Sequence, residues 1–218
     1  MVDRLPLFPL GTVLFPGAPL PLHVFEPRYR ELVQDLLAAP EPRAFGVVAI
    51  REGHEVGADA LRSLYDVGCV ALVQRVDALP DGRFAVMTVG TRRFRLLRTD
   101  DSRPYLQADV ELLTEPEVTG SSVTRLVDGV RRTFADYHSA LADPDSELEL
   151  PDDPALMSYV VAATLLLGLP DRQALLEAPN TEQRLQLEAD LLKRELGLIR
   201  TLRTVPMGQA PLPRHSQN

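Results

Sequence analysis

The 218-residue sequence contains no tryptophan, one cysteine (Cys69) and one lysine (Lys193). With a single cysteine, the chain can form neither an intrachain disulfide nor a zinc site of several cysteines. A nucleotide-binding P-loop needs a Gly-Lys pair to hold phosphates, whereas Lys193 follows a leucine. The same lysine lies in a leucine-striped segment with no serine nearby, so a Ser-Lys catalytic pair is not expected either.

Other residues that often carry chemistry are scattered along the chain. Cys69 lies in the apolar run VGCVALV, and we interpret it as a small buried hydrophobe rather than a nucleophile. The four histidines are His23, His54, His138 and His215. His54 has carboxylates near it within the polar stretch 51–63, but nothing else there has the spacing of metal ligands. We therefore expect no metal site, no cofactor, no catalytic site and no enzymatic activity.

Long apolar runs are missing as well. The most apolar later segment, 160–169, is ten residues long, whereas a membrane-spanning helix needs roughly 20. Asp3 and Pro6 interrupt the start of the chain, so no secretory signal is expected. A net charge of −8 and a pI near 5.0 disfavour attachment to nucleic acid or to anionic membranes. The sequence therefore predicts a cytoplasmic protein with no membrane partner, for which nucleic acid is an unfavourable partner.

Proline is concentrated at the start of the chain, where six of the 19 prolines lie within residues 5–33. Proline lacks the amide hydrogen and fixes φ, so this stretch can form neither a continuous helix nor a regular central strand. Its many apolar residues, Phe25 among them, are expected to leave water. We predict short extended pieces that bend at Pro16–Gly17 and press into a core. Apolar residues then recur at helical spacing, which predicts a helix over 28–38 with Pro27 at its start.

Short apolar runs separated by turn residues follow this opening. They predict strands at 44–50, 65–76, 84–89, 92–98 and 105–113. Pro80, Asp81 and Gly82 lie between the second and third of these strands. Because proline presets φ and glycine accepts positive φ, we expect a hairpin there. Strands at this spacing favour a small, twisted or partly closed β-barrel.

Beyond a polar stretch at 115–122, the pattern becomes helical. Apolar periodicity predicts helices at 123–141, 154–167, 171–177 and 180–203. The second is apolar almost all round and is expected to be the central helix of a bundle. We expect Asp171 to cap the third helix, and Asn180 and Gln183 to form a capping box on the fourth. Two leucine stripes on the fourth helix permit either two covered faces, or one covered face and one that meets a partner.

The expected fold class is therefore α+β. We expect a β subdomain over residues 1–117, a helical subdomain over 118–205 and a disordered tail over 206–218. The chain is long enough for one domain or for two coupled subdomains. The oligomeric state is left open.

Several short sequence motifs resemble those of the N-terminal domain of the Lon protease family, which cereblon also carries. The motifs are LPLFPL, VLFPGAPLPLHVFEPRY with the helix after it, and LLEAPNTEQRLQLEADLLKRELGLIRTL near the end. The resemblance spans about residues 5–202. It implies a PUA-like β-barrel subdomain followed by an α-helical bundle that ends in a long helix. Neither cereblon's zinc-bound domain nor the ATPase and protease domains of Lon are expected here.

The resemblance also implies a module that recognises unfolded or extended polypeptide. Such recognition needs an accessible apolar groove or an exposed strand edge. The candidate contact residues are Phe15, Leu20, Leu22, Glu26, Arg28 and Tyr29. The alternatives are core packing for the apolar residues and an internal ion pair between Glu26 and Arg28. We therefore expect a stand-alone, non-catalytic polypeptide- or partner-recognition protein, such as a quality-control adaptor that acts with a Lon-type protease.

Two other functions compete with this hypothesis. PUA-like folds often bind RNA, and Arg92, Arg93, Arg95 and Arg98 cluster around Phe94. In a strand, however, Arg92 and Arg93 point to opposite faces, and the overall charge is unfavourable. The remaining alternative is a hydrolase whose site is dispersed through the fold.

Overall fold

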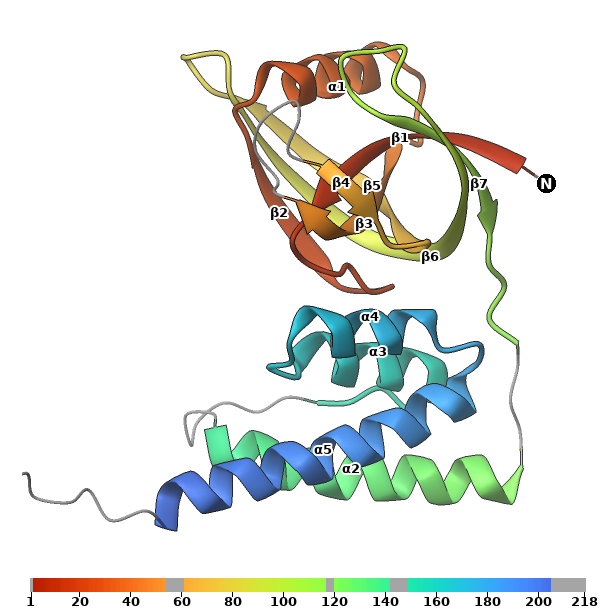
Figure 1. Ribbon diagram of the computed structural model, residues 1–218, viewed down its shortest axis with the longest axis vertical. Coiled ribbons are helices and arrows are strands. Elements are labelled where there is room, and N and C mark those ends of the chain that lie inside the picture. Colours follow the sequence, from red (N-terminus) through yellow and green to blue (C-terminus); the bar gives the residue numbers. More distant parts are fainter. Residues whose placement is uncertain (1, 54–60, 117–119, 142–148, 205–218) are drawn as a thin grey trace, which may run out of the picture.

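The computed structural model describes residues 2–53, 61–116, 120–141 and 149–204. The strands are β1 (Val2–Leu10), β2 (Pro19–Val24), β3 (Ala44–Gly53), β4 (Leu61–Leu64), β5 (Val67–Ala78), β6 (Phe84–Asp100) and β7 (Gln107–Leu112). The helices are α1 (Pro27–Ala38), α2 (Ser121–Leu141), α3 (Pro154–Thr164), α4 (Leu169–Glu177) and α5 (Thr181–Thr204). The β half and α1 lie on one side of the molecule and the other four helices on the opposite side (Figure 1). The α+β fold class is confirmed.

The strands form one mixed sheet whose path closes on itself. The order runs β1-β7-β6-β5-β3-β4, and β1 also pairs with β3 in parallel. The five strands β1, β7, β6, β5 and β3 therefore form a ring, around a core that includes stacked Phe8 and Tyr29 rings 4.0 Å apart. β2 lies outside this ring and pairs with the first part of β6.

Strand β6 differs from the sequence prediction, which divided it at Gly90 into two strands. It is one strand of 17 residues whose first part pairs with β2 and whose last part pairs with β7. Gly90 does not make a turn: a Cβ at this position would lie 2.2 Å from the backbone oxygen of Phe15. The glycine permits the turn before β2 to approach β6 closely. From the sequence alone, a glycine that ends a strand cannot be distinguished from one, such as Gly90, that permits close packing within a strand.

The proline-rich opening forms the predicted extended pieces. β1 and β2 flank a turn in which Gly17 has φ of +80°, a conformation that favours glycine. Leu7, Phe8 and Val24 are buried, as expected. Phe25 is the exception, because its side chain is 53% exposed. It lies where β2 ends and the chain enters α1, so it projects from the corner instead of entering the core.

Helix α1 and the predicted hairpin also agree with the sequence. Pro27 lies in the first turn of α1, where a missing amide hydrogen costs nothing. Gly82 has φ of +77° in the β5–β6 hairpin, as the Pro-Asp-Gly turn requires. The buried stripe of α1 packs on one end of the strand ring.

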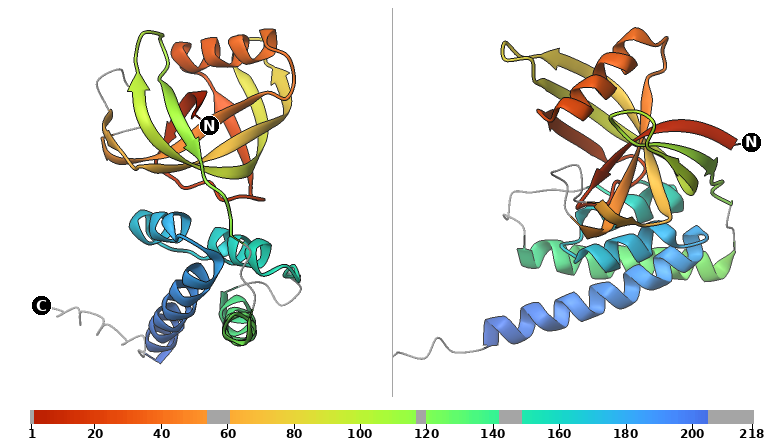
Figure 2. Two further views of the ribbon diagram at one scale, coloured as in Figure 1. Left: turned by 90° about the vertical axis from the view of Figure 1, so that its right-hand side faces the viewer. Right: turned by 45° about the horizontal axis from the view of Figure 1, so that its top comes forward.

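The four remaining helices form two layers beneath the sheet (Figure 2). α2 packs along α5 through one leucine stripe of α5, and α3 contributes Met157 and Val161 to the same core. Tyr159 and Ala162 of α3 instead contact the β half through a second cluster. This placement between two cores explains why α3 is apolar on nearly every side. No helix among the described residues is long and apolar enough to cross a membrane.

Some helix ends differ from the prediction. α3 ends at Thr164 rather than at 167, and the N-cap of α4 is Gly168, which leaves Asp171 within the first turn. Asn180 does cap α5, because its Oδ1 accepts a hydrogen bond from the Gln183 amide at 2.9 Å. The second leucine stripe of α5 is divided: Leu191 is buried, whereas Leu198 is 52% exposed.

The proposed subdomain limits remain predictions. Residues 117–119 and 205–218, which hold the predicted boundary and tail, lie outside the described part of the chain. So do residues 54–60, which include His54.

Candidate polypeptide-binding surface

A groove opens between the end of β1, strand β2 and the first turn of α1. Its volume is about 170 Å³. Its lining is mainly apolar and includes Phe8, Leu10, Pro21, Leu22 and Tyr29. Apolar walls with a few polar groups are typical of sites that take side chains of a ligand.

Proline blocks strand addition on the β2 side of this groove. Gly90 N donates to Ala18 O at 2.9 Å and Thr88 Oγ1 to Leu20 O at 2.9 Å, so the even-numbered residues of β2 face β6. The backbone of Pro19 and Pro21 therefore faces away from β6 without an amide hydrogen. Along this edge, β2 therefore presents carbonyl oxygens as hydrogen-bond acceptors but few amide donors.

The β1 side of the groove has the same feature. Leu7 N donates to Leu106 O at 2.8 Å, away from β3. Two residues further along, Pro9 faces the same direction, where β7 no longer pairs with β1. With proline on both borders, the groove is suited to ligand side chains rather than to an added strand. Of the two recognition modes considered from the sequence, the apolar groove is thus the one this surface provides.

The structure brings three of the six candidate contact residues together. Leu22, Glu26 and Tyr29 line the groove. Leu20 is half-buried and packs against the core inside the strand ring. Phe15 is only 1% exposed and lies on the far side of the turn, beneath the Arg172 guanidinium at 5.3 Å from its ring centroid.

The corner between β2 and α1 is fixed by charge. Arg28 Nη2 lies 3.0 Å from Glu26 Oε2, and Arg28 Cζ lies 4.6 Å from the centroid of the Tyr29 ring. The internal ion pair offered as an alternative from the sequence is therefore present. It holds Glu26 at the rim of the groove and orients the ring that forms its floor.

Two exposed apolar side chains, Phe25 in the lining of the groove and Met87 beside it, were missed by the sequence analysis. Phe25 is 53% exposed and Met87 is 41% exposed. Met87 is the register partner of Pro21 across the β2–β6 pair, so the two side chains share the outer face of the sheet. The sequence predicts Phe25 in the core because it is apolar, and it places Met87 in a strand without indicating which side of the sheet it faces. We call Phe25, Met87 and Pro21 the outer apolar patch.

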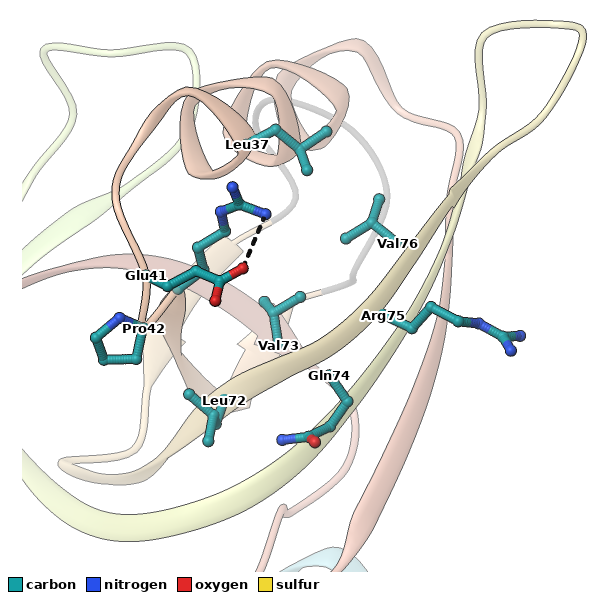
Figure 3. Close-up of a pocket in the computed structure, with 9 residues that line it drawn as sticks. Leu37, Glu41, Pro42, Leu72, Val73, Gln74, Arg75 and Val76 are labelled. Carbon is teal, nitrogen blue, oxygen red and sulfur yellow. Dashed lines mark ion pairs between the residues drawn. The ribbon is translucent and has the colours of Figure 1, made fainter.

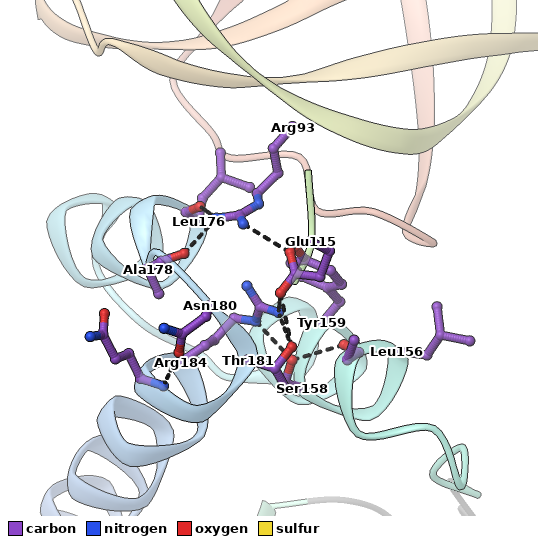
Figure 4. A network of polar contacts seen from close by, with 12 residues as sticks. Arg93, Glu115, Leu156, Ser158, Tyr159, Leu176, Ala178, Asn180, Thr181 and Arg184 are labelled. Atoms are coloured by element: carbon purple, nitrogen blue, oxygen red, sulfur yellow. Dashed lines mark hydrogen bonds and ion pairs between the residues drawn. The ribbon is translucent and has the colours of Figure 1, made fainter. Parts of the chain in front are cut away.

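A buried network of ion pairs joins the β half to the helices (Figure 4). Glu115, in the segment after β7, accepts from Arg93 of β6 at 2.8 Å and from Arg184 of α5 at 2.7 Å. Both arginine side chains are almost fully buried, at 3% and 0% exposure. Tyr159 of α3 donates to the same carboxylate at 2.5 Å. One carboxylate thus links β6, α3 and α5.

Charge explains the protonation state at this junction. Burial by itself would raise the pKa of Glu115, but the Arg184 charge and hydrogen bonds from Tyr159 and Arg184 offset it, so the pKa lies below its ordinary value. Burial raises the pKa of Tyr159, and its hydrogen bond to the carboxylate adds to the shift, so the phenol remains a donor. The carboxylate is held charged. These contacts fix the position of the helices beneath the strand ring.

The described residues give little support to nucleophilic chemistry. Cys69 is fully buried, and burial raises the pKa of its thiol to about 12, so the reactive thiolate is not formed at neutral pH. Lys193 is exposed and pairs with Asp190 at 3.6 Å. No group of three or more His, Cys, Asp or Glu side chains suited to a metal is found in the described part of the chain.

The arginine strip considered for RNA is divided by the fold. Arg93 is buried and donates to the carbonyl oxygens of Leu176 and Ala178 at 2.8 and 2.6 Å. Arg95 lies 3.6 Å from Glu111, and Arg98 lies 3.1 Å from Asp109. These carboxylates neutralise the strip that phosphate contacts would need.

Comparison with known proteins agrees with the fold and with the opening motif. The sequence model of the ATP-dependent protease La (LON) substrate-binding domain matches residues 4–194. Lon protease 1 of Thermus thermophilus is 32% identical over 201 residues, which cover 88% of this chain and 25% of that protein. Lon protease 1 of Herpetosiphon aurantiacus is 28% identical over 207 residues, which cover 90% of this chain and 25% of that protein. The chain spans about a quarter of the length of these relatives.

Solved structures show the same architecture. A crystal structure of a Lon N-terminal domain protein from Xanthomonas campestris is 26% identical, with a TM-score of 0.60 over 88% of this chain and 98% of that one. The N-terminal domain of Mycobacterium avium complex Lon protease superimposes with a TM-score of 0.61 at 17% identity, over the same shares, and supports the fold alone. The chain belongs to the LON substrate-binding domain family. The family is described by its binding of substrate, and the catalytic parts of Lon lie outside it.

Proposed function

We propose that this chain is a non-catalytic recognition module that holds unfolded or extended polypeptide through the groove and the outer apolar patch. The observation that carries the proposal is the pairing of an apolar groove with two exposed large apolar side chains, Phe25 and Met87, on a member of a substrate-binding family. Exposed apolar clusters of this kind mark interaction sites.

The groove and patch suit apolar segments of a ligand more than charged ones. Leu22 and Tyr29 offer apolar contact inside the groove, and Glu26 at its rim favours a ligand with a basic or amide group nearby. Of the six candidate residues, Leu22, Glu26 and Tyr29 are proposed to touch the ligand. Leu20 and Arg28 are proposed to support them, and Phe15 to anchor the turn behind them.

Binding to a fluorescein-labelled, reduced and carboxymethylated α-lactalbumin, followed by fluorescence anisotropy, tests this proposal. Phe25→Ala with Met87→Ala should weaken binding by about 30-fold, since each truncation removes apolar contact area worth roughly 1 kcal/mol. Leu97→Ala is the matched control, because Leu97 is 49% exposed on the part of β6 that β2 does not reach. Equal affinity in all three proteins would contradict the assignment of the surface.

The adaptor role is a finer part of the same proposal. We propose that the module presents bound polypeptide to a Lon-type protease in the cytoplasm, and that it does not itself cut peptide bonds. Adding the purified protein to a Lon-type protease with the labelled polypeptide should raise the rate of degradation. Cleavage by the purified protein alone would overturn the non-catalytic part, and binding without any effect on degradation would overturn the adaptor part.

A further inference from the structure

Part of strand β5 has a neighbour on one side only. The β3–β5 ladder ends at the Ala44–Leu72 pair, and its last hydrogen bond runs from Val73 N to Arg43 O at 2.9 Å. Beyond Arg43, the described residues show no further pairing of this segment with β5. β5 runs on to Ala78 with only β6 beside it, as far as the described residues show.

A hollow of about 530 Å³ lies beside this open edge (Figure 3). The last turn of α1 borders it with Leu37, and the Glu41–Arg43 ion pair borders it opposite β5. Val73 and Val76 point into it, whereas the Arg75 side chain extends outward (Figure 3). The hollow is where a strand next to β5 would run, because the chain before β3 has turned away.

The backbone of the open edge keeps its donors. Since the even-numbered residues of β6 face β2, Met87 and Ala85 face β5, together with their register partners Arg75 and Asp77. The amide and carbonyl of Val76 and Ala78 therefore point to the open side. Neither residue is proline, in contrast to Pro9, Pro19 and Pro21 beside the groove. This edge can accept another strand.

The charged side chains on this edge are complementary to those on the same edge of a second copy of the chain. Arg75 and Asp77 lie on one face of β5, 73% and 49% exposed, and pair with each other at 2.9 Å. If a second copy of β5 is placed antiparallel with Val76 opposite Val76, Arg75 of each copy lies opposite Asp77 of the other. Those opposing positions are the closer, non-hydrogen-bonded pairs, while Val76 exchanges two hydrogen bonds with its counterpart.

We propose that two copies of this chain associate through the β5 edge, antiparallel and centred on Val76. A slip of one copy by two residues would place Asp77 opposite Asp77 or Arg75 opposite Arg75, so charge selects this register. In this register, Ala78 of the second copy lies opposite Gln74, beside the hollow. The interface is isologous and closed, so the association stops at a dimer. The short ladder implies a weak, concentration-dependent dimer.

Sedimentation velocity on the full chain, over micromolar to millimolar concentrations, tests the proposal. Arg75→Asp and Asp77→Arg each place like charges opposite each other, and each should weaken self-association by about tenfold or more. An equimolar mixture of the two variants restores opposite charges at both positions, and it should associate as the original protein does. Recovery on mixing distinguishes loss of the interface from loss of the fold. Arg95→Asp is the control, because Arg95 is a similarly exposed arginine on β6.

Several results would overturn this proposal. They are a monomer at every concentration, variants that associate as the original does, and a mixture that stays monomeric. Loss of polypeptide binding in Arg75→Asp, in a protein that never dimerises, would assign the edge to substrate instead. The test does not depend on the proposed groove, since neither charged residue lines it.

Discussion

Replacement of Glu115 by glutamine is expected to destabilise the protein more than any exposed charge change. The variant keeps the shape of the side chain but removes the carboxylate charge that pairs with the buried Arg93 and Arg184. Breaking a buried ion pair from one side costs about 3–5 kcal/mol, because the remaining charge is poorly solvated. For a chain of this size, such a loss corresponds to a fall in Tm of roughly 6–20 °C.

The assay is equilibrium unfolding in urea, followed by circular dichroism at neutral pH. The matched control is Glu111→Gln, which removes an exposed carboxylate 3.6 Å from Arg95 and should cost no more than about 1 kcal/mol. If Glu115→Gln costs no more than this control, the junction does not depend on the carboxylate charge, and our account of it is wrong.

The pH dependence provides an independent check on Glu115. Its pKa is lower in the folded protein than in the unfolded chain, so its stabilising contribution is present above the unfolded pKa and is lost as the pH falls through the folded value. The difference in unfolding free energy between the original protein and Glu115→Gln should therefore be constant near pH 7. It should shrink below about pH 4.3, the ordinary value for glutamate. A difference that stays unchanged down to acid pH would exclude the electrostatic explanation.

Three further predictions follow from buried groups. Burial raises the pKa of Glu188, whose carboxylate oxygens have no hydrogen-bond partner, so stability present below about pH 4.3 is lost as the pH rises through the folded value. Glu188→Met should accordingly raise the unfolding free energy at pH 7 by about 1–3 kcal/mol, with no gain at acid pH, as urea titrations at both pH values would reveal. Gly90→Ala should cost about 1–3 kcal/mol in the same assay, since its Cβ would meet a backbone oxygen at 2.2 Å, whereas Gly129→Ala in open space within α2 should stabilise by about 0.5–1 kcal/mol. Cys69 should resist iodoacetamide until urea unfolds the chain, as mass spectrometry would measure; rapid labelling of the folded protein would contradict its burial.

Local sequence rules predicted those elements whose cause is local. The Pro27 helix start, the Gly82 hairpin and the Asn180 cap each depend on a few adjacent residues, and the structure confirms all three. The periodicity of the helices likewise located the buried face of each. The predicted helix ends were less accurate for α3 and α4. α3 ends three residues earlier than predicted, and α4 begins earlier because its N-cap is Gly168 rather than Asp171.

Features set by distant segments could not be predicted in the same way. Gly90 permits an approach by Phe15, 75 residues earlier in the chain, which no local pattern reveals. Phe25 is apolar and was assigned to the core, yet the bend that exposes it depends on how β2 joins α1. The groove lies between β1 and β2, which pair with other strands and not with each other in the described part of the chain. The sequence therefore named three of its residues without indicating their arrangement. The open edge of β5 becomes visible only once the β3–β5 register is known.

The use of arginine in this chain connects stability with function. Twenty-two of the 23 basic residues other than histidine are arginine. The guanidinium group holds its charge when buried and donates in several directions, which suits it to link elements that a lysine could not. Arg93 binds two carbonyl oxygens of the helical half together with Glu115, and Arg172 donates to Val13 O at 3.3 Å across the same junction. These arginines hold the helices against the strand ring, whereas the groove beside β2 is lined mainly by apolar side chains. This difference supports our proposal of a polypeptide ligand.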